Sequence, residues 1–362
     1  MHILFYFKKL NDIGGVESFI YYLSKKFDFE FYYKEGNPGF EEQIKRLSYN
    51  VLVKKYKGEK LVCDKFFVNY NPDIINNVEA KEKIFLIHCD YGQVKFAPPN
   101  PKLFDRIIGV SQLVCDSFEK ITGVKPELCY NPVYIDKPKV KKKPGLHIIY
   151  AGRMSSEKNG ILIDKFKDVM DKSGIKYDLS IYTDRAVHFK SKNIIIEKPK
   201  LDLTKEIAEA SFMLVTSKHE AYCLSAVESL YLGTPLICTD LPVFKELGID
   251  DTNSIKIGFN LEGFNPKDLL KKFDFTYKPP KDNWSKYLPK KSGKYDPNQK
   301  VKVRVLKKKL WLVEEDVHLK RNNTYELPIV RANYLVAKDY VVIDDGTIDL
   351  DSPEDINRLK ID

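Results

Sequence analysis

Two cations five residues apart are the first candidates for chemistry in this 362-residue chain. Arg153 and Lys158 stand in YAGRMSSEKNG (150–160), where an apolar run ends in Ala151-Gly152 and an amphipathic segment, ILIDKFKDVM, follows. This order predicts a strand, a loop and a helix start, and the free N–H groups of a helix N-terminus favour anions. A guanidinium can bind phosphate oxygens through two N–H groups, and an ammonium adds a mobile positive charge. The pair therefore fits a diphosphate site, although two cations beside a loop are also common on ordinary protein surfaces.

Two carboxylates eight residues apart are the second candidate. Glu220 stands at an expected strand-to-helix junction in TSKHEAYCLSAVESLYLG, and Glu228 follows inside the helix, roughly two turns later. A carboxylate at such a helix mouth can accept the two hydroxyls of a ribose. The alternative is a pair of solvent-exposed glutamates that flank a helix.

Alternating apolar strands and amphipathic helices have to position these groups. Over the first 135 residues, the apolar runs HILFYF, FEFYY, KFFVNY, KIFLIHC and RIIGVS predict strands, and residues 15–27 and 112–123 show the helical period. Strands separated by helices predict a parallel sheet covered on both faces. The pattern restarts at residue 146, after a connector rich in lysine and proline (136–145), and continues to about residue 290.

On this interpretation the chain has an α/β fold in three parts. Residues 1–140 and 141–290 form two doubly wound domains of Rossmann type with a cleft between them, and residues 291–362 form a basic linker and a small β-rich domain. Ligands of open α/β sheets bind beyond the carboxyl ends of the strands. Arg153 and Lys158 are therefore expected to face the cleft.

Positive charge is concentrated in residues 281–309. This stretch holds eleven Lys and Arg against two Asp, a surplus of nine that equals the formal net charge of the whole chain. A solvated, partly flexible linker is one interpretation. A surface that binds an anionic partner, either nucleic acid or a membrane, is the other.

Composition narrows the class of protein. A hydrophobic content of 43% with 12% aromatic residues is typical of a folded globular chain. No apolar run reaches the roughly 20 residues that cross a bilayer, and the first residues predict a strand rather than a signal peptide. The six cysteines show no CxxC spacing, which argues against a disulfide framework or a zinc site. We therefore expect a cytoplasmic protein, with peripheral membrane binding as an alternative.

Five segments, taken in order, resemble retaining GT-B glycosyltransferases of the family-4 type. AGRMSSEKN (151–159) looks like the GRLSxEKG loop of that family, and EAYCLSAVE (220–228) looks like its E-x7-E element. GTPLICTDLPVFKELG (233–248) is similar to the segment that follows, GGVESFI (14–20) to the Gly-Gly loop, and YNPVYID (130–136) to the end of the first domain. The resemblance extends over about two-thirds of the chain and implies a GT-B fold.

The resemblance also implies an activity: transfer of a sugar from a nucleotide-sugar donor to a hydroxyl acceptor, with retention, without a metal and with no further cofactor. Arg153 and Lys158 would neutralise the donor diphosphate, Glu228 would hold the ribose, and Glu220 would hold a hydroxyl of the donor sugar. His88, at the end of KIFLIHC (83–89), matches a position near the reacting sugar. The other donor-binding positions that it implies are Gly14, Gly15, Gly152, Tyr222, Cys223 and Leu224.

Departures from the family pattern bear mainly on the donor. Ala221-Tyr222-Cys223 follows Glu220 where the family has Gly-Phe-Gly, and Pro132 replaces a glycine. The acceptor is expected on the first domain, where the loop DYGQVKFAPPNP (90–101) and many aromatic residues lie. Two alternatives stay open: a glucosyltransferase that acts on modified nucleic-acid bases, and a non-catalytic protein that binds nucleic acid or membrane on a degenerate GT-B scaffold.

Overall fold

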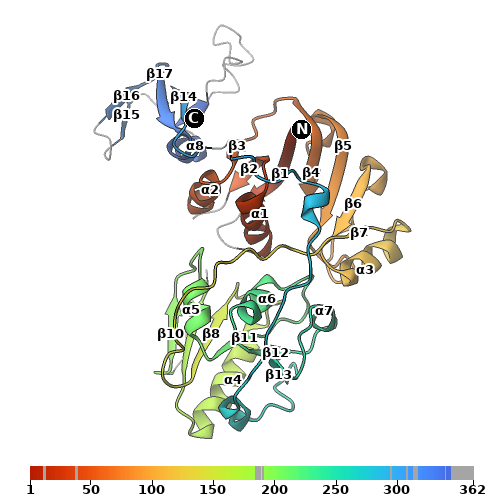
Figure 1. Cartoon of the computed structure of the whole chain (residues 1–362), viewed down its shortest axis with the longest axis vertical. Coiled ribbons are helices and arrows are strands. Elements are labelled where there is room, and N and C mark those ends of the chain that lie inside the picture. Colours follow the sequence, from red (N-terminus) through yellow and green to blue (C-terminus); the bar gives the residue numbers. More distant parts are fainter. Residues whose placement is uncertain are drawn as a thin grey trace.

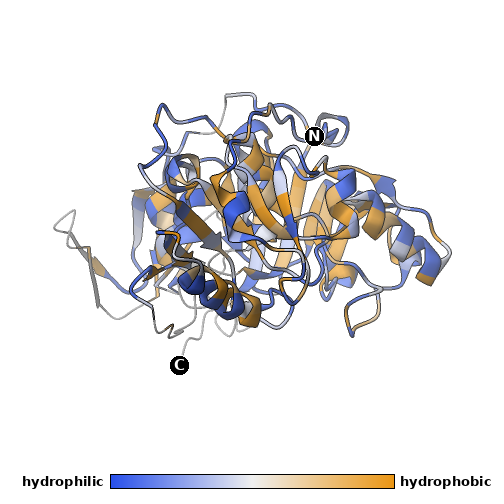
Figure 2. Ribbon diagram, turned by 90° about the horizontal axis from the view of Figure 1, so that it is seen from below, coloured by the Kyte–Doolittle hydropathy of each residue, from blue (hydrophilic) through white to orange (hydrophobic). Residues whose placement is uncertain are grey.

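The computed structural model of the chain describes residues 1–10, 14–36, 40–183, 189, 191–293, 296–306, 309–312, 317–338 and 340–343. Two parallel sheets dominate it, one above the other in Figure 1, and a smaller unit lies beside the first. Strands in the interior are mainly hydrophobic, whereas the helices show one apolar and one polar face (Figure 2). No helix in the described ranges is long and apolar enough to span a bilayer.

The first sheet has seven parallel strands in the order β3-β2-β1-β4-β5-β6-β7. This order places β1 next to the central strand β4, so the loop after β1 opens at the carboxyl edge beside the loop after β4. The helices of this domain are α1 (Gly15–Lys26), α2 (Phe40–Ser48) and α3 (Gln112–Thr122). The strands are β1 (Ile3–Leu10), β2 (Glu30–Gly36), β3 (Leu52–Lys55), β4 (Leu61–Asn69), β5 (Val78–Ile87), β6 (Arg106–Gly109) and β7 (Glu127–Leu128).

Helices cover this sheet less evenly than expected. The connection from β4 to β5 and that from β5 to β6 hold only short 3-10 turns, Ile75–Asn77 and Pro101–Leu103. Tyr6 shows what covers the sheet in place of a helix. Its ring contacts Tyr56 in the loop after β3, and its hydroxyl donates to Asp73 in the loop after β4. Buried loops with aromatic side chains therefore replace helices over part of one face.

The second sheet has six parallel strands in the order β10-β9-β8-β11-β12-β13. Its helices begin after the carboxyl ends of strands, which is where the expected site residues stand. The strands are β8 (His147–Ala151), β9 (Asp178–Tyr182), β10 (Ile194–Glu197), β11 (Phe212–Val215), β12 (Leu236–Thr239) and β13 (Ser254–Ile257). The helices are α4 (Gly160–Ser173), α5 (Thr204–Glu209), α6 (Leu224–Tyr231), α7 (Pro242–Glu246) and a 3-10 helix, Pro266–Leu270.

The smaller unit combines strands with one helix. Strand β14 (Lys300–Val305) pairs antiparallel with β17 (Thr324–Pro328) and β18 (Val341–Ile343), and β15 (Lys309–Leu312) pairs with β16 (Val317–Lys320). The β content is as expected, but reading the whole region 301–345 as strands is wrong for α8 (Ile329–Ala337). Ile and Val suggested a strand there, whereas the buried residues recur at helical spacing (Ile329, Ala332, Leu335 and Val336).

Helix α8 packs on α2 and β3 of the first domain (Figure 1). The contact includes a buried hydrogen bond of 3.1 Å from Asn333 Nδ2 to Ser48 Oγ and an ion pair between Lys338 and Glu41. The smaller unit is therefore joined to the first domain.

Residues 281–292 form a return segment that comes back from the second domain to the first. The expectation of a flexible linker over 281–309 is wrong for this part of it. Trp284, in a single 3-10 turn (Trp284–Lys286), is fully buried against Phe19 and Phe67. Its indole N–H donates to the carbonyl of Tyr130 at 2.9 Å. The number of charged residues gave no sign that this segment packs on the first domain, because Trp284 stands between lysines in the sequence.

Two lysines of the return segment, Lys286 and Lys291, bind to the first domain. Lys291 Nζ donates to the carbonyls of Ser24 and Asn50 at 3.2 and 2.7 Å, near the C-terminal ends of α1 and α2. Carbonyls that close a helix are natural partners for a cation, and burial lowers the pKa of Lys291. Lys286 pairs with Glu127 at 2.7 Å. Lys294, Lys307 and Lys308 lie outside the described residues.

Candidate functional site

One cavity between the two domains brings all the expected site residues together. Its volume is about 1250 Å³, and both carboxyl edges contribute to it. The residues placed in its lining are Gly14, Gly15, His88, Gly152, Arg153, Lys158, Glu220, Tyr222, Cys223, Leu224 and Glu228. Four separate segments of sequence thus meet in one place, although the role of each residue stays a prediction.

Lys158 and Glu220, which both line the cavity, form an ion pair. The loop after β8 and the loop after β11 are held together by two bonds: Thr216 Oγ1 donates to the Lys158 carbonyl at 2.6 Å, and the Lys218 N–H donates to the Glu157 carbonyl at 2.8 Å. These bonds bring the Lys158 ammonium onto Glu220 Oε1. Two loops that are far apart in sequence therefore present one charged pair.

Opposite effects set the protonation of this pair. Burial by itself raises the pKa of Glu220, but the Lys158 ammonium and a hydrogen bond of 2.7 Å from the Ser217 hydroxyl lower it overall. Burial likewise lowers the pKa of Lys158, and the Glu220 carboxylate more than offsets this and raises it. Both groups are therefore charged at neutral pH, which is the state needed to hold an anion and a hydroxyl.

Arg153 stands at the rim of the cavity. Its side chain is 56% exposed and pairs with Glu157 at 3.0 Å. An exposed pair of this kind is worth at most about 1 kcal/mol, so a ligand phosphate can replace the carboxylate at little cost. Gly152 precedes it, and an added Cβ would lie 3.2 Å from the Tyr150 hydroxyl, tighter than ordinary contact.

The N-terminus of α6 carries a backbone conformation that favours glycine. Cys223, the residue before the helix, has φ 69° and ψ 69°, in the left-handed region. This conformation costs a residue with a side chain roughly 1–2 kcal/mol, and it explains why the resembled family has glycine there. Tyr222 and Leu224 on either side are buried. Burial raises the pKa of Cys223, so its thiol is protonated at neutral pH.

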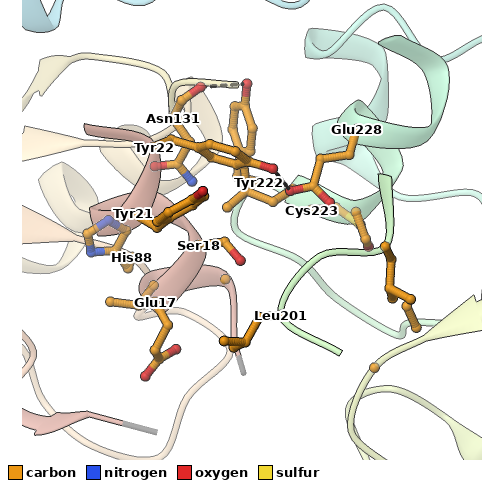
Figure 3. Close-up of a pocket in the computed structure, with 18 of the residues that line it drawn as sticks. Glu17, Ser18, Tyr21, Tyr22, His88, Asn131, Leu201, Tyr222, Cys223 and Glu228 are labelled. Atoms are coloured by element: carbon orange, nitrogen blue, oxygen red, sulfur yellow. Dashed lines mark hydrogen bonds between the residues drawn. The ribbon is translucent and has the colours of Figure 1, made fainter. Parts of the chain in front are cut away.

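Glu228 meets a residue of the first domain across the cavity. The Tyr22 hydroxyl, from α1, donates to Glu228 Oε1 at 2.7 Å, as the dashed line in Figure 3 shows. Burial raises the pKa of Glu228, and the bond from Tyr22 partly opposes that rise. Arg46 of α2 also acts on it, as a positive charge close by. This carboxylate is thus positioned from both domains.

The Gly-Gly loop and His88 form the first-domain wall. Gly14 has an extended backbone with φ −168°, so a left-handed conformation is not what requires glycine there. His88 follows β5, and its ring contacts Phe19. Both ring nitrogens are buried without a hydrogen-bond partner in the described residues. Burial lowers the pKa of His88 to about 3, so the imidazole is neutral at physiological pH.

Sequence reasoning missed residues that hold the others in place. Ser217 and Thr216 fix Glu220 and Lys158, and a polar pair just before Glu220, at the end of an apolar strand, was the available signal. Asn131 also escaped notice. Its Oδ1 is buried with no hydrogen-bond partner, while its backbone carbonyl accepts from the Tyr222 hydroxyl at 3.2 Å (Figure 3).

Within the described ranges, no group of three or more His, Cys, Asp or Glu side chains is arranged to hold a metal ion. The cavity lining includes several cationic side chains, which are Lys8, Lys9, Lys25, Arg46, Arg153, Lys158 and Lys200.

Solved structures share this arrangement of two domains, although their sequences are only distantly similar to this one. No protein-family model matches the chain, and a search of curated proteins gives no match. Anabaena Alr3699/HepE in complex with UDP-glucose superposes with a TM-score of 0.56 at 12% identity, over 72% of this chain and 87% of that one. The chain has the GT-B fold.

Two further GT-B structures agree with this. The lipopolysaccharide outer core galactosyltransferase WaaB, in its apo form, gives a TM-score of 0.50 at 15% identity, over 71% of this chain and 86% of that one. Sucrose-phosphate synthase from Thermosynechococcus elongatus gives 0.50 at 11%, over 71% and 86%. At such identities the likeness is one of fold, and the chemistry has to be argued from the cavity.

Proposed function

We propose that this protein is a glycosyltransferase that moves a sugar from a nucleotide-sugar donor to a hydroxyl acceptor, with retention and without a metal. The observation that carries the proposal is the cavity, in which Arg153, Lys158, Glu220 and Glu228 converge from separate loops. Retention is proposed from the resemblance of residues 220–228 to the E-x7-E element of the retaining enzymes. A UDP-sugar is the donor to test first, because HepE was solved with UDP-glucose.

The charges suit the departure of a nucleoside diphosphate. As the bond to the sugar breaks, negative charge grows on the phosphate oxygen, and fixed cations aimed at it lower the barrier. Lys158 is held there by the loops after β8 and β11, Arg153 can leave Glu157, and the N-terminus of α6 faces the same cavity. Glu220 is left to accept a sugar hydroxyl once the phosphate draws Lys158 toward it.

Glu228 suits the nucleoside. Tyr22 binds one carboxylate oxygen, and the residue lines the cavity. A carboxylate so placed can accept the hydroxyls of a ribose. Closure of the two domains on the donor would then exclude water from the reacting sugar.

The two alternative functions, both of which involve binding to nucleic acid or a membrane, depend on the basic segment 281–309. Part of this segment is bound to the first domain through Lys286 and Lys291. Lys281, Lys290, Lys300 and Lys302 remain exposed on the surface. Binding of duplex DNA that weakens steeply with salt, without any stabilisation by nucleotides, would favour the non-catalytic alternative instead.

The test is a thermal-shift series with UDP, GDP, ADP and UDP-glucose, on the wild type, Arg153→Ala and Arg153→Ala/Lys158→Ala. A ligand at a hundredfold its Kd adds about 2.7 kcal/mol to stability, so one nucleotide should raise the wild-type Tm by several degrees. The shift should shrink in the single variant and vanish in the double one. Each shift is taken from that variant's own Tm, because loss of Lys158 leaves Glu220 buried and unpaired.

Lys172→Ala/Lys176→Ala is the matched control, since it removes two exposed cations of the second domain outside the cavity. The control should keep the full nucleotide shift. A wild type that no nucleotide stabilises, or a double variant that responds as the wild type does, would overturn the proposal.

A further inference from the structure

Two aromatic side chains of the first domain are exposed inside the cavity. Tyr70 follows β4 and Phe96 lies in the loop of residues 90–101, and both belong to the cavity lining. They are 38% and 49% exposed, whereas most large aromatic side chains of this domain are buried. Their rings contact each other edge to face, 6.4 Å between centroids. Apolar surface kept open to a cavity is a feature of binding sites.

The backbone at Tyr70 is strained in a way that presents its ring. Tyr70 has φ 48°, a left-handed conformation that is unusual for a bulky side chain. Such strain persists where the surrounding structure imposes it, and it gathers at ligand sites. Here the Tyr70 hydroxyl donates to the His88 carbonyl at 3.2 Å. This bond ties the strained residue to the neighbouring strand end.

The loop that carries Phe96 is held in place by aromatic packing and by hydrogen bonds. Phe96 packs edge to face on Tyr91 (5.8 Å, 84°), and Tyr91 in turn packs on Phe118 of α3. The Ser117 hydroxyl donates to Asp90 Oδ1 at 2.5 Å, and the Gly92 N–H donates to the same oxygen at 2.9 Å. These contacts hold the loop in which Phe96 lines the cavity.

Two residues of the cavity lining, His88 and Asn131, carry buried polar atoms that have no hydrogen-bond partner in the described residues. These atoms are Nδ1 and Nε2 of His88 and Oδ1 of Asn131. A buried donor or acceptor without a partner is costly, so a ligand with several hydroxyls fits this wall better than an alkyl chain does. Tyr70 and Arg153 line the same cavity.

We infer that the acceptor is a carbohydrate, and that Tyr70 and Phe96 form the platform on which its sugar ring stacks. A pyranose has apolar C–H faces and a rim of hydroxyls. The aromatic pair suits the faces, and His88 and Asn131 suit the rim. This inference rests on the proposed function, because it assigns the substrate class of the acceptor half of that site.

The experiment measures acceptor and donor separately. Saturation-transfer NMR with maltose, cellobiose, lactose and chitobiose, in the presence of UDP, reports sugar binding. Release of UDP from UDP-glucose with the same disaccharides reports transfer. The variants are Phe96→Ala, Phe96→Tyr and Tyr70→Asn, since asparagine tolerates the left-handed conformation. Phe259→Ala is the matched control, because Phe259 is 47% exposed on the second domain, outside the cavity.

At least one disaccharide should bind the wild type and accelerate UDP release. Phe96→Ala and Tyr70→Asn should raise its KM roughly two- to tenfold, as expected for the loss of one aromatic contact, with kcat little changed. Phe96→Tyr and Phe259→Ala should behave as the wild type, and stabilisation by UDP-glucose should be the same in all five proteins.

Two results would overturn the inference: no disaccharide binding to the wild type, or a Phe96→Ala KM equal to that of Phe259→Ala. If UDP-glucose still stabilises the protein, the proposed function survives: in the first case the acceptor belongs to another class, and in the second case the sugar binds away from Phe96. If sugars bind in a Phe96-dependent way while no nucleotide stabilises the protein, the platform stands and the donor proposal fails.

Discussion

Tyr22 and Glu228 link the protonation of one carboxylate to the neighbouring domain. Burial raises the pKa of Glu228 above its usual 4.5, and the Tyr22 hydroxyl, 2.7 Å away, opposes this by stabilising the charged form. If Glu228 accepts ribose hydroxyls, nucleotide affinity falls as the pH drops through that pKa. Tyr22→Phe removes the opposing bond, so the affinity should start to fall at a pH higher by roughly one unit.

The measurement is the UDP affinity of wild type and Tyr22→Phe by calorimetry between pH 5 and 8. Tyr21→Phe is the control, since Tyr21 is the preceding residue and its ring, which stacks on Arg46 at 3.3 Å, is kept. If the UDP affinity falls at the same pH in all three proteins, then either Glu228 does not contact the nucleotide or Tyr22 does not influence the pKa of Glu228.

At the level of elements, the return segment should be part of the first domain's core. Trp284→Ala removes a fully buried indole that contacts Phe19 and Phe67. The loss of a buried aromatic of this size costs about 3–5 kcal/mol, so urea unfolding should shift by that amount. Lys290→Ala, an exposed neighbour, should stay within about 0.5 kcal/mol of the wild type. A Trp284→Ala variant as stable as Lys290→Ala would mean that the segment is dispensable for the fold.

The sequence predicts some elements well and others poorly, for physical reasons. Continuous apolar runs such as residues 3–7 and 212–215 are buried strands, because a strand covered on both faces needs apolar residues at every position. Helix α2 was not expected, since FEEQIKRLS is mostly polar and buries only a narrow stripe that includes Ile44 and Leu47. Helix α8 was mistaken for a strand because its Ile and Val residues suit both structures.

At the scale of the whole molecule, what the sequence predicts is the set of site residues rather than their pairing. Motif order placed Lys158, Glu220 and Glu228 in one site, and all three line the cavity. Their partners were not predictable, since Lys158 meets Glu220 across 62 residues of chain and Tyr22 meets Glu228 across 206. Local spacing carries no information on which loops of one sheet edge meet, as Lys158 and Glu220 do, or on how two domains dock, as Tyr22 and Glu228 require.

One such contact should govern the arrangement of the two domains. Glu246, in α7 of the second domain, accepts hydrogen bonds from the Gln112 and Leu113 N–H groups at the start of α3 in the first domain, at 2.5 and 3.3 Å. A carboxylate at a helix N-terminus satisfies free N–H groups and interacts favourably with the helix dipole. Because the cap comes from the other domain, it stabilises both the helix and the domain contact.

Glu246→Ala should therefore lower the free energy of unfolding by about 1 kcal/mol and increase the radius of gyration of the nucleotide-free protein in small-angle scattering. Asp240→Ala is the control, because Asp240 is an exposed carboxylate of the same domain that pairs with Lys256. It should change neither quantity. A Glu246→Ala protein with wild-type stability and dimensions would show that other contacts, such as the Ser111 hydroxyl on the Ala221 carbonyl at 2.6 Å, hold the domains together. If the variant expands and UDP-glucose then restores the wild-type radius, the cap and the donor stabilise the same closed arrangement.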